Sequence, residues 1–177
     1  MRLFMAFDVS EEAENELKRQ QAALKKTDPG LGFTREFHLT LKFLGEVDEK
    51  LVGELKSRLS RIKFDAFTAN LSDAGVFPSE DYIRAAWIGL EPKEKINALQ
   101  QQIEGSLEGM FQKEERFHPH LTLARVKFIK DKKALIGGLK RMDVKKVNFR
   151  VDSFKLIKST LAPGGPVYEV LEEFKAK

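Results

Sequence analysis

The chain has 177 residues, of which 42% are hydrophobic and 33% are charged, and these proportions are typical of a folded globular protein. The absence of cysteine excludes disulfide bonds, thiolate nucleophiles and cysteine-bound zinc, and the net charge of +4 permits an anionic substrate without requiring one. No apolar run approaches the ~20 residues that span a bilayer, and Asp8 ends the apolar N-terminus without a cleavage site. We therefore expect a cytoplasmic protein with no membrane association.

In the first half of the chain, Ser10 followed by acidic residues predicts the start of a helix. Leucines at helical spacing after Asp48 predict another, and alternating apolar residues predict strands. The expected elements are a strand over 2–9, a helix over 10–26, a strand over 38–44, a helix over 48–62, and an antiparallel pair over 64–76 and 82–90 with its turn at 77–81.

The second half repeats this order of elements. A helix is predicted over 92–111, a strand over 120–126, a short helix over 131–140, and a closing hairpin with strands over 147–159 and 167–174. Each half thus reads helix, strand, helix, hairpin, which indicates a structural repeat. We predict an α+β fold in which residues 1–177 form a single domain. It would have two pseudo-symmetric lobes with antiparallel sheets flanked by helices, and an active-site cleft between them.

One tetrapeptide occurs twice. His38-Leu39-Thr40-Leu41 (motif 1) and His120-Leu121-Thr122-Leu123 (motif 2) contain two of the three histidines in the chain. On a strand, residues i and i+2 point to the same side, so each motif directs a histidine and a threonine to one face and two leucines to the other. The leucines are expected in the core. An internal duplication accounts for the repeat and predicts that the two motifs meet across the cleft.

Two facing imidazoles can supply a general base and a general acid at one pH, and two hydroxyls can donate hydrogen bonds to phosphate oxygens. This combination is suited to in-line displacement at phosphorus. Phosphate also requires positive charge. Lys42 is four residues after His38 and shares the face of motif 1 on a regular strand. Arg125 is five residues after His120, so on a regular strand it would point to the opposite face, and it reaches the cleft only from a bulge or a strand end. From spacing alone, we interpret both Lys42 and Arg125 as surface charges rather than phosphate-binding residues.

A metal site is the main alternative, with His118, His120 and His38 as ligands. It leaves the repeated threonine without a role, and neither motif contains a carboxylate. His118 is therefore expected to support the second motif strand structurally, and we predict neither a metal nor a cofactor. The chain has no Gly-x-Ser-x-Gly nucleophile elbow and no phosphate-binding loop of the ATPase type.

The chain resembles the two-histidine (H-x-T) phosphoesterase superfamily, and within it the RNA 2′,3′-cyclic phosphodiesterase branch, also called 2′-5′ RNA ligase. The resemblance covers nearly the whole chain. The matching segments are Arg2–Ala6, His38–Gly45, Gly75–Pro78, Trp87–Gly89, Phe117–Arg125 and Ser159–Phe174.

The resemblance implies metal-independent opening of RNA 2′,3′-cyclic phosphate ends to 2′-phosphomonoesters, with ATP-independent 2′-5′ ligation as a related reaction. It implies that His38 and His120 are the catalytic acid and base respectively, an assignment that the symmetry of the motifs leaves open. Thr40, Thr122 and Arg125 would bind the phosphate. The expected partner is RNA with a 2′,3′-cyclic phosphate end, bound by a monomer.

Two questions stay open at this point. Three phenylalanines are candidates for stacking on a terminal base. Phe33, in a loop, is the better one, because Phe7 and Phe43 are expected in the core. The other question is activity, since an RNA-end binding module that does not turn over is the alternative function. Such a module has no need of two titrating side chains.

Overall fold

The computed structural model describes all 177 residues. Its elements follow one another in the order β1 (Arg2–Asp8), α1 (Glu11–Lys25), β2 (Leu31–Phe33), β3 (His38–Glu46), the 3-10 helix η1 (Glu49–Leu51), α2 (Val52–Leu59), β4 (Phe67–Pro78), β5 (Ile83–Glu91), α3 (Lys93–Ser106), β6 (His120–Val126), α4 (Lys132–Lys140), β7 (Asn148–Val151), β8 (Ser153–Ala162) and β9 (Gly165–Lys175).

Helices α1 and α4 begin at residues whose side chains cap them. The Ser10 hydroxyl accepts a hydrogen bond from the Ala13 amide at 3.2 Å, and Asp131 caps α4 in the same way. Helix α3 is shorter than predicted, because the chain turns at Gly109 with a φ of +79°, a conformation that favours glycine. No helix is both long enough and apolar enough to cross a membrane.

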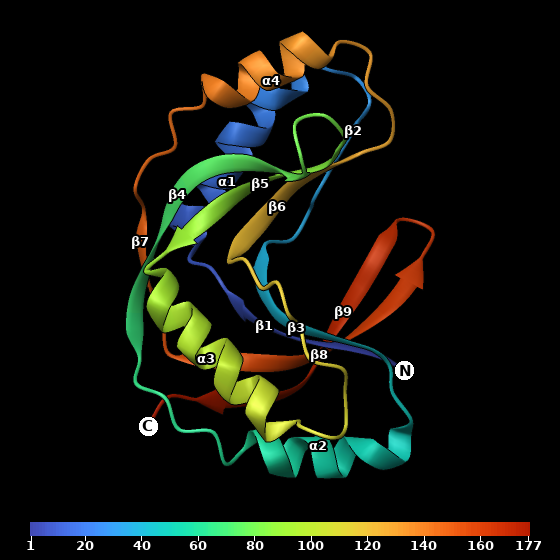
Figure 1. The fold of residues 1–177 in the computed structure, drawn as a ribbon, viewed down its shortest axis with the longest axis vertical. Coiled ribbons are helices and arrows are strands. Elements are labelled where there is room, and N and C mark those ends of the chain that lie inside the picture. The colour runs from blue at the N-terminus through green and yellow to red at the C-terminus, as the bar shows by residue number, and fades with distance from the viewer.

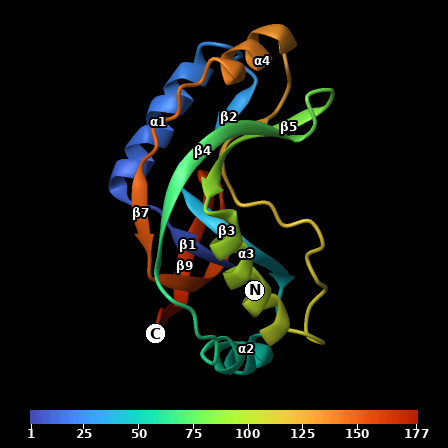
Figure 2. The same ribbon diagram turned by 60° about the vertical axis from the view of Figure 1, so that its left-hand side comes forward.

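The strands form two antiparallel sheets, which confirms the predicted α+β fold with two lobes. The first lobe contains the sheet β3-β1-β8-β9 with α2 and α3, and the second contains β2-β6-β5-β4-β7 with α1 and α4 (Figures 1 and 2). Each lobe holds one motif strand. The lobes are not consecutive halves of the chain, however, since α1, β2 and β4 precede the midpoint and lie in the second lobe. The chain crosses between the lobes several times.

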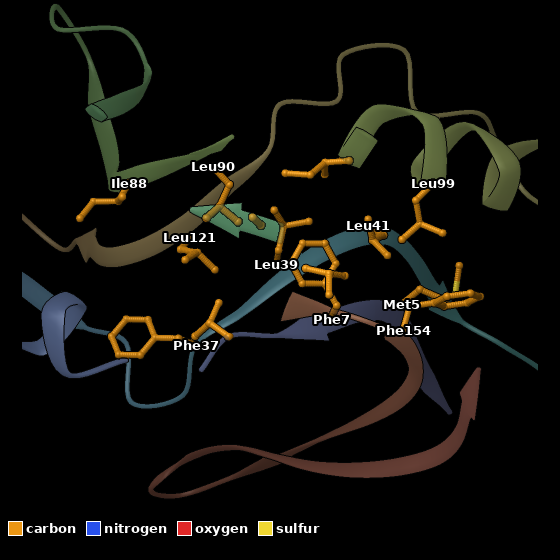
Figure 3. Close-up of a cluster of buried hydrophobic side chains, with 14 of the residues drawn as sticks. Met5, Phe7, Phe37, Leu39, Leu41, Ile88, Leu90, Leu99, Leu121 and Phe154 are labelled. Atoms are coloured by element: carbon orange, nitrogen blue, oxygen red, sulfur yellow. The ribbon is translucent and has the colours of Figure 1, made fainter. Parts of the chain in front are cut away.

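A single cluster of 37 buried residues joins the two lobes. Leu39 and Leu41 from β3 and Leu121 from β6 are at most 1% exposed, and their side chains point into this cluster (Figure 3). The prediction that the motif leucines are core residues is confirmed. Truncating one such leucine to alanine typically costs about 2–5 kcal/mol, so the motif strands are held firmly from their inner face.

Two predicted strands differ from the structure. The strand expected over 147–159 is two strands in different sheets: β7 pairs with β4 in the second lobe, and β8 pairs with β1 in the first. The chain changes sheet at Asp152, where the buried positions shift from 149 and 151 to 154 and 156. Strand β4 continues through Pro78, so the turn before β5 begins later in the structure than the predicted turn at 77–81. Strand β2 was not predicted, because Gly32 interrupts a run of only three residues.

Candidate active site

Both motif strands contain the same irregularity, one residue after the threonine. In β3, Ala6 pairs with Thr40 and Met5 with Lys42, so that Leu41 has no partner on β1. In β6, the partners of Trp87 and Ala86 are residues 122 and 124, so residue 123 is skipped in the same way. A bulge of this kind adds one residue and reverses the alternation of faces beyond it.

The bulge therefore brings the fifth residue after each histidine onto the face of the histidine and threonine. These residues are Phe43 in β3 and Arg125 in β6, and both are exposed. Arg125 takes part in no ion pair and no side-chain hydrogen bond. From its parity, Arg125 could reach this face only through a bulge or a strand end, and β6 contains the bulge.

The same bulge turns Lys42 inward, which contradicts the prediction that it shares the face of motif 1. Its ammonium group donates to both carboxylate oxygens of Glu104, at 2.9 and 2.8 Å, and to the Gln112 carbonyl at 2.7 Å. Both ends of the ion pair are buried, and Glu104 also accepts from Gln100 and from the Glu114 amide. Lys42 thus ties β3 to α3 and to the segment that leads into motif 2.

His120 is held by a neighbouring carbonyl and by aromatic rings. Its Nδ1 lies 2.7 Å from the backbone oxygen of His118. Because a carbonyl only accepts, the hydrogen is on Nδ1, and Nε2 of the neutral ring keeps its lone pair. Phe77 packs edge-on at 4.8 Å between ring centroids, and Trp87 lies at 6.2 Å. Burial is the main cause that lowers the pKa of His120; the hydrogen bond with the His118 carbonyl raises it, and the charges of His118 and Arg125 lower it further.

His118 supports motif 2 from behind, through its backbone oxygen and its ring. The ring packs on Trp87 at 4.7 Å, and its Nδ1 is buried without a hydrogen-bond partner. Trp87 in turn occupies the space above Gly75, where an added Cβ would lie only 2.3 Å from the indole ring. No group of three or more His, Asp or Glu side chains is arranged to hold a metal ion.

His38 stands between two aromatic rings of the first lobe. The Phe4 ring lies at 5.0 Å and the Tyr168 ring at 5.1 Å, the latter perpendicular to the imidazole. His38 pairs across the sheet with Asp8, which forms an ion pair with Lys155. Burial lowers the pKa of His38, and the negative charge of Asp8 acts in the opposite direction.

Tyr168 is a residue of this region that the sequence analysis missed. It lies on β9, and its ring contacts both His38 and Phe4. Burial raises the pKa of its phenol, the charge of Glu36 raises it further, and the charge of Arg125 lowers it. Tyr168 thus contacts the histidine of motif 1 and also experiences the charge of Arg125 from β6. Nothing in its local sequence pattern indicates this position, because β9 is remote from both motifs along the chain.

The three candidate stacking phenylalanines lie in different surroundings. Phe7 is 1% exposed in the core, as expected. Phe33 is half-buried and packs against the core, whereas Phe43 is 63% exposed, so the expectation that Phe43 is a core residue is wrong. The reason is again the bulge in β3, which moves Phe43 from the inner to the outer face.

Comparison with known proteins agrees with this repeated architecture. The sequence profile of the LigT like Phosphoesterase family matches the chain twice, over residues 7–87 and 88–168, with one motif in each match. The chain belongs to this phosphoesterase family. The two matches also confirm that the chain contains an internal repeat.

Individual members of the family are similar over their full length. The RNA 2′,3′-cyclic phosphodiesterase of Methanocaldococcus jannaschii is 37% identical, covering 98% of this chain and 100% of that protein, and its namesake from Thermotoga maritima is 35% identical, covering 98% and 94%. Among solved structures, TT0787 of Thermus thermophilus has a TM-score of 0.82 with 30% identity, covering 99% of this chain and 97% of the other. Escherichia coli LigT complexed with 3′-AMP has a TM-score of 0.76 with 26% identity over the same shares.

Proposed function

We propose that this protein is an RNA 2′,3′-cyclic phosphodiesterase, which opens the cyclic phosphate at the 3′ end of an RNA to a 2′-phosphomonoester. The observation that carries the proposal is the repeated bulged strand. It presents a histidine and a threonine twice and adds one unpaired cation, Arg125, on the side of motif 2. Relatives that are similar along the whole chain bear the same activity in their names.

In this reaction His120 acts as the general base. Its Nδ1 is engaged by the His118 carbonyl, so its free Nε2 can take a proton from water as the water oxygen attacks phosphorus. The P–O3′ bond breaks on the opposite side of phosphorus, and His38 donates a proton to the departing O3′. The phosphate stays on O2′. After each turnover, the proton on His120 and the proton lost by His38 are exchanged with solvent.

The charges near the two histidines support this division of roles. Asp8 lies across the sheet from His38 and favours its protonated form, whereas Arg125 disfavours the protonated form of His120. An acid needs a proton to give and a base needs a free lone pair, so the surroundings of each ring suit its role. The motifs themselves are identical, and the asymmetry comes from their neighbours.

Phosphate binding falls to Thr40, Thr122 and Arg125. Their hydroxyls and guanidinium group can donate to the non-bridging oxygens, where negative charge accumulates during displacement. Because the departing O3′ carries the nucleoside, the ribose lies towards His38 in this arrangement. The exposed ring of Phe43, on the same face of β3, is then available to stack on the terminal base.

The same groups can join RNA ends. A 5′-hydroxyl in place of water would give up its proton to His120 and form a 2′-5′ linkage, without ATP. We further propose that residues 1–177 act as one domain, in keeping with the large core cluster that joins both lobes, and that the protein is a cytoplasmic monomer.

Incubation with a 2′,3′-cyclic mononucleotide, with and without a chelator, tests the proposal. We expect equal rates of 2′-nucleotide formation under both conditions. Activity that disappears with chelator and returns with added zinc would favour a metal hydrolase. RNA-end binding without any product would favour the non-catalytic module. The double substitution of His38 and His120 by alanine is the control for contaminating nucleases.

A further inference from the structure

Beyond Arg125, the outer face of the second lobe carries another cation in line with motif 2. Lys127 follows directly after β6, and its amide donates to the Gly30 carbonyl at 2.9 Å, which continues the pairing with β2. Residues i and i+2 of an extended chain share a face. Lys127 therefore points to the same side as Arg125, while Val126 between them packs against the core.

The position of the Lys127 side chain agrees with this direction. Gly32 is the β2 partner of Arg125, so an added Cβ on Gly32 would point to the same face. That Cβ would lie 3.1 Å from Cε of Lys127 and 3.8 Å from its Nζ. The lysine chain thus lies across the bare backbone of Gly32, beside Arg125.

Neither cation is neutralised by the protein. The side chains of Lys127 and Arg125 are exposed and take part in none of the ion pairs or side-chain hydrogen bonds of the chain. Some lysines and arginines elsewhere are paired, including Lys56, Arg58 and Lys155, and what distinguishes Arg125 and Lys127 is their position in line with motif 2. Two unpaired cations next to motif 2 thus form a short positive track, about 7 Å long by strand geometry.

We infer, on the basis of the proposed function, that Lys127 forms a second phosphate subsite, which binds the internucleotide phosphate on the 5′ side of the terminal ribose. Successive phosphates of an RNA strand have a spacing comparable to that of Arg125 and Lys127. In a nucleotide the base is attached at C1′ and the 5′-phosphate through C4′, on the two sides of the ribose ring oxygen. With the base at Phe43 in the first lobe, the 5′-phosphate is directed towards the second lobe, where Lys127 lies.

This subsite gives the enzyme a preference for RNA ends over mononucleotides. A 2′,3′-cyclic mononucleotide without a 5′-phosphate leaves Lys127 unused, whereas a dinucleotide with the same 3′ nucleoside and a cyclic phosphate has one internucleotide phosphate. The wild-type protein should therefore have a higher kcat/KM for the dinucleotide. Replacing Lys127 by alanine should lower that value about tenfold, as expected for one charge-assisted hydrogen bond, and leave the mononucleotide unaffected.

The design includes matched controls. Lys63, an exposed residue after α2, has no ion-pair partner, so Lys63→Ala removes the same charge elsewhere and should change neither value. Lys127→Arg should keep the preference. In Lys127→Ala the dependence of dinucleotide affinity on salt should become shallower by about 0.7, the slope for one phosphate of a single strand.

Equal losses for both substrates in Lys127→Ala, or a wild-type protein without preference, would overturn the subsite and leave the hydrolytic function intact. A loss confined to ligation would also overturn it, because Lys127 would then contact the strand with the 5′-hydroxyl. A wild-type protein that hydrolyses neither substrate would instead refute the proposed function, and the subsite with it.

Discussion

Replacing Lys42 by methionine should destabilise the fold strongly and leave the chemistry at the histidines almost unchanged. The substitution removes three hydrogen bonds at once and leaves the buried carboxylate of Glu104 without its cation. Removing one partner of a buried ion pair typically costs about 3–5 kcal/mol. In a chain of 177 residues this corresponds to a fall in the melting temperature of about 6–20 °C.

Thermal or denaturant unfolding measures this loss, and hydrolysis of a cyclic nucleotide well below the melting temperature measures the chemistry. The double variant Lys42→Met/Glu104→Leu should lose less stability than the two single losses combined, because it leaves no unpaired buried charge. Gln100 and the Glu114 amide still lose an acceptor, so recovery will be incomplete. If Lys42→Met melts like the wild type but loses activity and salt dependence, Lys42 contacts the substrate and its structural role is wrong.

The remaining predictions concern the two motif histidines and their neighbours. Alanine at His38 or His120 should lower the rate about 10²- to 10⁴-fold, and the double variant should lose much less than the product of the two. His118→Ala should be milder, because its backbone carbonyl remains; equal inactivation would require a direct chemical role for this ring. The pH–rate profile should be bell-shaped and displaced to the acid side of two ordinary histidines, because burial lowers both pKa values. Asp8→Asn removes a charge that raises the pKa of His38, so the alkaline limb should move to lower pH, and an unmoved limb would rule out His38 as the acid. Tyr168→Phe keeps the ring that packs on His38, so its hydrolysis rate should be closer to that of the wild type than the rate of Tyr168→Ala. The reverse order of the two rates would contradict a packing role.

The sequence predicted the site best where strand parity applies. The histidine, threonine and leucines of each motif lie on the faces that alternation assigns to them, and the duplication correctly placed one motif in each lobe. The bulges could not be predicted from regular alternation. A single extra residue inverts every position after it, and this is why Lys42 and Phe43 exchanged the places expected for them. The mismatched parity of Arg125 was the one local indication of a bulge.

The fold was predictable at the level of elements, and its connections were not. Local periodicity indicates a strand but not the sheet that the strand joins. The phase shift of apolar residues at Asp152 was a readable sign of a break, since residues 149 and 154 cannot share one face of a continuous strand. Tyr168 lies opposite Ser159 in the hairpin of β8 and β9, and it reaches His38 because β8 pairs with β1, a long-range contact that leaves no local pattern.

The crossing of the chain between the lobes has a consequence for synthesis on the ribosome. Strand β1 pairs on one side with β3, which follows soon after it, and on the other side with residues 155–159 of β8. The first sheet therefore cannot close until residues 155–159 have emerged, and one edge of β1 stays unpaired until then. Tyr168 arrives later still. The enclosure of His38 consequently requires β9, so a chain that ends before residue 168 cannot have a finished active site.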